Sequence, residues 1–262
     1  MTKKNLKIGL TLSGGGARGF AHIQILKAFD ELGIKPAYIS GTSMGAVIGS
    51  MYASGLSALD IGELFKNLKL KQFLRLFDLS VKGSGLLKGN RIQEIFETAL
   101  RGKTFSDLEI PLKIVATRYY KRDQLVFESG KVDFAVRASM SIPGIFEPVP
   151  YEGDLLLDGG LVNLIPFDIL EDDCDHVIAI DVSEEIPGPN KLNMIDFLAT
   201  SFSIVQGKYA EELLKVNPPD YYMKITLKGL AMMEFNKYDF IMSKTNKYRL
   251  EMKRHLKEIL DL

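Results

Sequence analysis

The chain has 262 residues and a formal net charge of zero, with 46% hydrophobic and 25% charged residues. This length is sufficient for one large α/β domain with a substantial core. The balanced charge gives no global sign of nucleic-acid binding, so any basic surface must be local. The single cysteine, Cys174, excludes an internal disulfide framework and indicates a reducing compartment.

The N-terminal segment begins with basic residues and continues into a short apolar run that ends at glycines. That run is too short for most signal peptides and is typical of a first buried strand. The sequence has no stretch of about 18 apolar residues, so we expect no membrane-spanning helix. These observations predict a cytoplasmic protein, either free or in peripheral contact with the inner face of the membrane.

Strands and helices alternate in the first part of the chain. Short apolar runs predict strands at 6–12 and 37–40, and helical spacing of apolar residues predicts helices at 19–33 and 44–55. This alternation favours a parallel sheet. The rest of the sequence predicts helical structure at 58–101, a β-hairpin at 111–130, a short helix at 133–140, strands at 154–158, 175–183 and 220–227, and helices at 194–216 and 246–260. Without a repeat or a linker, we expect a single domain over residues 1–262.

Three consecutive glycines follow the first strand, in LSGGGARG. Glycine allows a tight turn and directs successive backbone N–H groups into free space. With a helix N-terminus behind them, these groups form a site for a phosphate or for the oxyanion of a tetrahedral intermediate. Gly14, Gly16 and Gly19 also match a dinucleotide-binding pattern. That pattern requires an acidic residue at the end of the second strand, where this sequence has Ser40 and Gly41.

The second strand runs into a G-x-S-x-G sequence formed by Gly41, Ser43 and Gly45. A strand before the serine and a helix after it are the context of a nucleophile elbow, which exposes the serine hydroxyl on a sharp turn. The small residues also suit a tight helix–strand joint without a catalytic role. Ser43 is the candidate nucleophile, and it needs a base that accepts its proton.

Asp158 is the next candidate site residue. It ends an apolar strand and precedes Gly159 and Gly160. An Asp-Gly pair commonly forms a turn, but strand ends are the places where parallel sheets build their sites. This position favours a functional role for the carboxylate.

The three histidines have less suitable settings. His22 lies in the helix after the glycine loop, where we expect it to pack or to brace the loop. His176 begins a strand, and His255 belongs to a lysine-rich terminal helix. A triad of Ser43 and Asp158 with either His176 or His255 remains an alternative.

Four collinear blocks resemble the signature blocks of patatin-like phospholipases, which are lipid acyl hydrolases with a Ser-Asp dyad. The blocks are LTLSGGGARGFAHIQIL, ISGTSMGAVIGSMYASG, ASMSIPGIFEPV and LLLDGGLVNLIPFDIL. The resemblance implies a three-layer α/β/α sandwich with a mostly parallel central sheet, and neither a metal nor an organic cofactor. It also implies that Ser43 is the nucleophile, that Asp158 is the base, and that the glycine loop forms the oxyanion hole with Gly14, Gly15, Gly16, Arg18 and Gly19.

From this resemblance we expect a lipid acyl hydrolase of the phospholipase A, lysophospholipase or esterase type, with a phospholipid or another acyl ester as substrate. An acyltransferase that uses the same dyad and a lipid-binding protein without hydrolysis are the alternatives. Two positions depart from the family pattern: Leu164 replaces the second asparagine after Asp-Gly-Gly, and Arg118 replaces an aspartate of many relatives. We expect both to affect the shape of the pocket.

Residues 64–91 combine an apolar stripe with an excess of basic side chains. Leu70, Phe73, Leu74 and Phe77 have helical spacing, and Asp78 is the one acid of the segment. A basic amphipathic segment can lie on an anionic membrane or act as a lid over the site. A helix that docks on the core with a solvated basic face explains the same pattern.

Overall fold

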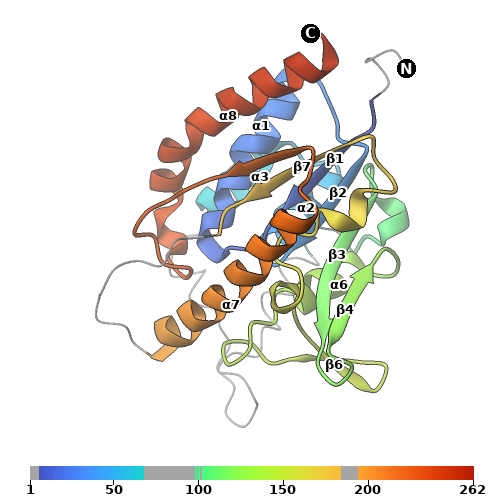
Figure 1. Cartoon of the computed structure of the whole chain (residues 1–262), viewed down its shortest axis with the longest axis vertical. Coiled ribbons are helices and arrows are strands. Elements are labelled where there is room, and N and C mark those ends of the chain that lie inside the picture. Colours follow the sequence, from blue (N-terminus) through green and yellow to red (C-terminus); the bar gives the residue numbers. More distant parts are fainter. Residues whose placement is uncertain (1–5, 68–97, 99, 101, 184–193) are drawn as a thin grey trace.

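The computed structural model describes residues 6–67, 98, 100, 102–183 and 194–262 of the chain (Figure 1). Its strands are β1 (Ile8–Leu12), β2 (Tyr38–Thr42), β3 (Leu112–Arg118), β4 (Asp123–Phe127), β5 (Val149–Tyr151), β6 (Asp154–Asp158), β7 (His176–Asp181) and β8 (Tyr221–Lys224). Its α-helices are α1 (His22–Leu32), α2 (Met44–Ala53), α3 (Ala58–Asn67), α6 (Val132–Ser139), α7 (Met194–Val216) and α8 (Tyr238–Leu260).

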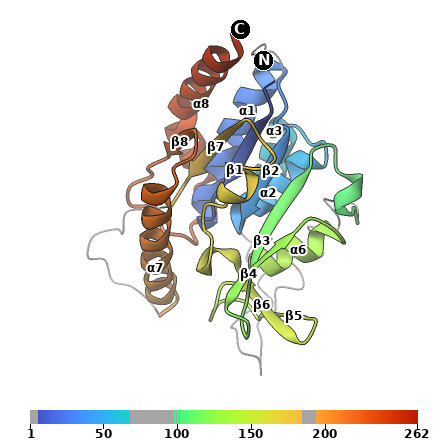
Figure 2. The same ribbon diagram turned by 45° about the vertical axis from the view of Figure 1, so that its right-hand side comes forward.

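In the described residues the strands form one sheet with the order β5-β6-β3-β2-β1-β7-β8, and β4 pairs with β3. The central pairs from β3 to β8 are parallel. Strands β4, β5 and β6 extend the sheet by antiparallel pairs, on the side away from α8 (Figures 1 and 2). The parallel centre aligns the carboxyl ends of β1, β2 and β7 at one edge, which is called the carboxyl edge below.

The two faces of the sheet pack against different helices, because successive side chains of a strand point to opposite sides. Ile178 and Ile180 of β7 belong to the larger apolar core, together with residues of α1, α2 and α8. Val177 and Ala179 belong to a second cluster that includes Phe167 and Ala210 of α7. The sheet therefore lies between two helical layers, and the predicted three-layer α/β/α sandwich is confirmed.

Most elements expected from the sequence are present in the described residues. The long helix α7 has the predicted bounds, and Gly33 ends α1 with a φ of 65°. Two expectations were incomplete: α8 begins eight residues earlier than predicted, at Tyr238, and the sequence patterns did not indicate β5. The start of α8 is preceded by the short 3-10 helix Phe235–Lys237, which continues directly into it.

The basic segment 64–91 lies outside the described residues except for its first four positions, which end α3. The predicted lid or membrane contact stays a prediction, as does the single domain over residues 1–262. In the described parts of the chain, no helix has both the length and the hydropathy that are needed to cross a bilayer.

Candidate active site

Ser43 occupies the sharp turn between β2 and α2. Its φ of 53° and ψ of −121° are unusual for a residue with a side chain, so the turn stores strain. Gly45 allows α2 to approach the sheet, since a Cβ at this position would lie 2.0 Å from the Leu12 carbonyl oxygen. The N-terminus of α2 follows Ser43 immediately and favours negative charge near its hydroxyl. The predicted strand–turn–helix context of Ser43 is present.

The structure brings Ser43 and Asp158 together. The Ser43 hydroxyl lies within hydrogen-bonding reach of the Asp158 carboxylate, and the Gly160 N–H donates to Asp158 Oδ1 at 2.8 Å. The exposed fraction of Asp158 is 1%. Burial raises the pKa of Asp158 to about 7, although the Gly160 N–H and the Ser43 hydroxyl favour the ionised form. A carboxyl group with this pKa can accept a proton at neutral pH.

The two residues meet because two strands end head to head along β3. Strand β2 runs parallel to β3, and its last residue, Thr42, pairs with Val115. Strand β6 runs antiparallel to β3 and ends at Asp158, which pairs with the next residue, Ala116. This corrects one part of the sequence argument: Asp158 ends an antiparallel strand, and it lies at the site because β6 points back towards the end of β2.

Three hydroxyl-bearing residues that the sequence analysis did not single out hold this pair. The Ser43 N–H donates to Ser139 Oγ at 2.8 Å, and Ser139 Oγ donates to the Val115 carbonyl at 2.6 Å. The Asp158 N–H donates to the Ser141 carbonyl at 2.9 Å, and Thr117 Oγ1 donates to the Asp158 carbonyl at 2.8 Å. Ser139 and Ser141 belong to the block ASMSIPGIFEPV, so the block was visible in the sequence, but its positioning role was not.

The glycine loop lies beside Ser43, between β1 and the 3-10 helix η2 (Gly16–Ala21). The Gly14 N–H donates to the Leu164 carbonyl at 3.1 Å, and the Ala17 N–H donates to the Met232 carbonyl at 2.8 Å. Between these two bonds, the N–H groups of Gly15 and Gly16 donate to no acceptor among the described residues. A Cβ on Gly14 would lie 3.3 Å from the Ser43 Cβ, so the loop and the serine are in contact. The loop thus offers two backbone donors next to the hydroxyl.

Arg18 and Gly19 are buried, and they hold the loop by other contacts. The Arg18 guanidinium donates to the Val182 carbonyl at 3.2 Å and to the Leu230 carbonyl at 3.1 Å. Gly19 packs against Met44, which would clash with a Cβ at 2.2 Å. The side chain of Arg18 therefore ties the loop to the segments after β7 and β8.

His22 braces the same loop. It is fully buried, and its Nε2–H donates to the Ser13 carbonyl at 2.9 Å. Burial lowers the pKa of His22 to about 4, against the effect of this hydrogen bond, so the ring is neutral at pH 7. The expected bracing role of His22 agrees with this geometry.

His176 and His255 lie at the opposite end of the sheet from Ser43. His176 begins β7 and pairs with Ile8, the first residue of β1, whereas Ser43 follows the last residue of β2. The Nε2 atoms of His176 and His255 are 3.2 Å apart, and the His255 ring stacks on Tyr221 at 3.7 Å. The structure therefore brings neither histidine to Ser43, and both triad alternatives are wrong in this geometry.

The two positions that depart from the family pattern have different settings. Leu164 is buried against the glycine loop, where its side chain would lie 2.9 Å from a Cβ on Gly14. Arg118 forms a two-pronged ion pair with Asp123 at 2.6 and 2.7 Å across the β3–β4 hairpin. Leu164 thus contacts the site, whereas Arg118 ties the two strands of the hairpin together.

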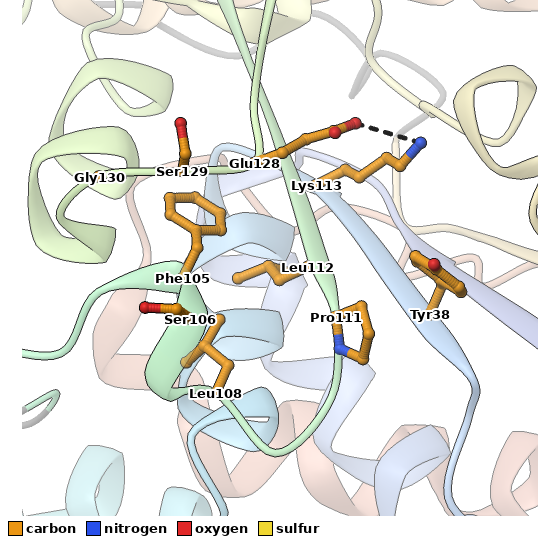
Figure 3. A pocket seen from close by; sticks show the side chains of 10 residues that line it. All are labelled: Tyr38, Phe105, Ser106, Leu108, Pro111, Leu112, Lys113, Glu128, Ser129 and Gly130. Atoms are coloured by element: carbon orange, nitrogen blue, oxygen red, sulfur yellow. Dashed lines mark ion pairs between the residues drawn. The ribbon is translucent and has the colours of Figure 1, made fainter.

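A hollow of about 430 Å³ lies at the amino ends of β2 and β3 (Figure 3). Ser43 follows the carboxyl end of β2, at the opposite edge of the sheet. Lys113 lines it and forms ion pairs with Asp173 at 2.6 Å and with Glu128 at 3.1 Å. None of the predicted site residues lines this hollow. In the described ranges, no group of three or more His, Cys, Asp or Glu side chains is arranged to hold a metal ion.

The sequence of this chain is similar to those of NTE family proteins. An uncharacterized NTE family protein of Mycobacterium tuberculosis is 35% identical over 185 residues, which are 70% of this chain and 51% of the relative. Lysophospholipase NTE1 of Pyricularia oryzae is 29% identical over 281 residues, which cover 96% of this chain and 19% of that protein. The chain therefore spans about half of the first relative and about a fifth of the second.

The solved structure of VipD from Legionella pneumophila has the same fold, with a TM-score of 0.69 at 14% identity over 95% of this chain and 67% of VipD. Residues 10–171, which include the glycine loop, Ser43 and Asp158, match the patatin-like phospholipase family. Because this match covers more than half of the chain, the protein belongs to the patatin-like phospholipase family.

Proposed function

We propose that the protein is a lipid acyl hydrolase that cleaves fatty-acyl esters through Ser43, Asp158 and an acyl-enzyme. One observation carries this proposal: the Ser43 hydroxyl, held on a strained turn, lies within hydrogen-bonding reach of a buried carboxylate with a pKa raised to about 7. A strained nucleophile and a shifted base in contact with each other are typical of an active site. The family, and the fact that the fungal relative is named a lysophospholipase, support a lipid ester as substrate.

In the first step, Ser43 Oγ attacks the ester carbonyl carbon while its proton moves to Asp158. The carbonyl oxygen becomes an oxyanion, and the N–H groups of Gly15 and Gly16 are the donors proposed to stabilise it. When the tetrahedral intermediate collapses, the bond between the acyl carbon and the alcohol oxygen breaks. The proton on Asp158 passes to the leaving alcohol, and the fatty acid stays bound to Ser43 as an ester.

In the second step, water replaces the alcohol. Asp158 accepts a proton from water while the water oxygen bonds to the acyl carbon, and the bond to Ser43 Oγ breaks. The proton returns to Ser43, and the fatty acid leaves. Both steps require ionised Asp158 at their start, so we expect kcat/KM to increase with pH through the region around 7 and then to level off.

The substrate class that we propose is a phospholipid, a lysophospholipid or a simpler acyl ester. Because the chain spans only part of the relatives named above, the activity is proposed for this chain and is not transferred from them. Acyl transfer to an alcohol or a lysolipid uses the same acyl-enzyme, and added acceptor distinguishes it from hydrolysis by its ester product.

The test combines active-site labelling with lipid product analysis. A fluorophosphonate reagent should label the wild type and the Ser50→Ala variant, and it should not label Ser43→Ala. Ser50 is a matched control, since it is a buried serine of α2 whose hydroxyl bonds to the Val47 carbonyl. Mass spectrometry should show fatty acid released from phospholipid or lysophospholipid vesicles by the first two proteins only. Labelling or release that survives Ser43→Ala would contradict the proposal.

A further inference from the structure

A polar side chain that no motif identifies lies directly beside the Asp-Gly-Gly loop. Gln206 belongs to α7, which contacts the 3-10 helix η4 (Gly159–Leu161) that follows Asp158. Its exposed fraction is 5%, so most of the side chain is buried. No hydrogen bond joins its carboxamide to another residue in the described part of the chain, and neither polar atom is among the fully buried side-chain atoms that lack a partner. The carboxamide therefore keeps contact with solvent, and a water molecule can bond to it.

The carboxamide is close to the Asp158 carboxylate. A Cβ placed on Gly160 would lie 2.0 Å from Gln206 Nε2 and 3.0 Å from Asp158 Oδ1. These two atoms therefore cannot be more than about 5 Å apart, although no direct hydrogen bond joins them. One water molecule that bonds to both atoms spans roughly 4.5–5.5 Å. The upper limit of about 5 Å leaves room for a single bridging water.

We propose that Gln206 is a positioning residue that holds the water which Asp158 activates during deacylation. This inference rests on the proposed function, since it concerns the second step of the same reaction. The water oxygen bonds to the acyl carbon, its proton moves to Asp158, and the bond from the acyl carbon to Ser43 Oγ breaks as Ser43 regains a proton. Gln206 changes no covalent bond; it fixes the position of the attacking oxygen.

If Gln206 positions the water, replacing this residue changes deacylation and leaves acylation unaffected. In Gln206→Met, which keeps the length of the side chain and removes its polarity, acylation of Ser43 should remain close to that of the wild type. Deacylation should slow by about 10- to 100-fold, as expected when a reactant loses its alignment. Val205→Ala is the matched control, because Val205 is the preceding residue of α7 and its exposed fraction is 62%.

The experiment uses stopped-flow kinetics with a p-nitrophenyl ester, together with intact-protein mass spectrometry. For Gln206→Met we expect a burst of about one p-nitrophenolate per protein, a slow steady state and an acyl adduct on Ser43. Fluorophosphonate labelling of this variant should proceed at the wild-type rate, and Val205→Ala should resemble the wild type throughout. Deacylation at the wild-type rate in Gln206→Met, or an equal slowing of labelling and turnover, would overturn the proposal.

Gln206→Glu provides a second test if the methionine variant does not fold. It keeps the size of the side chain and places a carboxylate near Asp158, so like-charge repulsion should move the pH dependence of deacylation to higher pH. A wild-type pH dependence in this variant would overturn the role of Gln206. Failure of the proposed function looks different, since Ser43 of the wild type would then react with neither the ester nor the fluorophosphonate.

Discussion

Ser43 and Asp158, at the carboxyl edge of the parallel strands, are held in unfavourable states, whereas Lys113 and Asp220 at the amino edge are paired. At the carboxyl edge, Ser43 has a φ of 53°, and burial raises the pKa of Asp158 to about 7. At the amino edge, Lys113 forms ion pairs with Asp173 and Glu128, and Asp220 accepts the Val177 N–H at 2.7 Å. Both edges belong to the same sheet, so the strand geometry itself does not cause the difference.

The comparison indicates that two residues at the carboxyl edge lower the stability of the folded state. A strained serine and a buried carboxylate each destabilise the folded state, and such groups gather at functional sites. The Ser43 N–H donates to Ser139 Oγ, and Asp158 accepts hydrogen bonds from Thr117 Oγ1 and the Gly160 N–H; these bonds keep both residues in place. Replacing the strained Ser43 or the Asp158 carboxylate should therefore stabilise the protein while it abolishes activity.

Asp158→Asn should be more stable than the wild type above pH 7. The pKa of Asp158 is about 7 in the folded state, against an ordinary value of 3.8, so its stabilising contribution is present below pH 4 and is lost as pH rises to 7. The stability advantage of the variant over the wild type should therefore increase by up to about 4 kcal/mol in the free energy of unfolding between pH 4 and pH 8. Denaturant unfolding of both proteins from pH 4 to 9 measures this gain.

Asp154→Asn is the matched control for this prediction, because Asp154 begins the same strand. Backbone N–H donors, with Tyr120 first, lower the pKa of Asp154, so its ionised form stabilises the folded state. The variant should be less stable than the wild type at neutral pH. A loss of stability in Asp158→Asn at pH 8 would contradict the view that the buried carboxylate is destabilising.

His22 should make the wild type sensitive to acid. Burial lowers its pKa from 6.5 to about 4, so the unfolded state binds the proton first and stability is lost as pH falls from 6.5 to 4. This loss should reach about 3 kcal/mol. His22→Gln, whose amide can still donate to the Ser13 carbonyl, should show a smaller decrease in the free energy of unfolding over the same range. An equal decrease in both proteins would assign the acid sensitivity elsewhere.

Ser43→Gly should be more stable than Ser43→Ala by about 1–2 kcal/mol, because glycine tolerates the positive φ of this turn. At Ser50, which lies inside α2, we expect the opposite order of stability for the glycine and alanine variants. There, glycine should be less stable than alanine by about 0.5–1 kcal/mol. Thermal melting of the four variants measures both differences. Equal melting temperatures for the two Ser43 variants would show that the turn is not strained.

The smallest effect is expected at the amino edge. Burial lowers the pKa of both His176 and His255, while Asp220 and Glu258 act in the opposite direction. Replacing the pair by His176→Gln and His255→Gln should reduce the loss of stability below pH 6.5, since two charged rings 3.2 Å apart repel each other. Melting temperatures at pH 5 and pH 8 test this. An unchanged pH dependence would show that the pair does not sense acid.

The local elements of the site could be predicted from the sequence because short-range patterns determine them. The glycine loop lies between a strand and a helix, and Ser43 lies between β2 and α2, as the alternation of apolar runs and glycines predicts. The bracing role of His22 followed from its place in the helix after that loop. These features depend on residues within about ten positions of each other.

The contact between Ser43 and Asp158 could not be derived from local patterns. It depends on β6 running antiparallel to β3 and ending opposite Ala116, one residue beyond the end of β2. Nothing in the apolar run of β6 specifies its direction, so the family resemblance alone indicated the pairing. Gln206 was missed for a similar reason: a single glutamine on a long helix carries no signal until the helix is placed against Gly160.

The central claim is that Asp158 serves as the base and that no histidine does. A pH profile alone cannot test it, because a carboxyl group with a pKa of about 7 titrates where histidine does. The direct measurement is kcat/KM, with a short soluble ester, for Asp158→Asn and for the double variant His176→Ala, His255→Ala. The account predicts a decrease of ~10²–10⁴-fold for the first and activity within a few fold of the wild type for the second. A folded double variant as inactive as Asp158→Asn would contradict it.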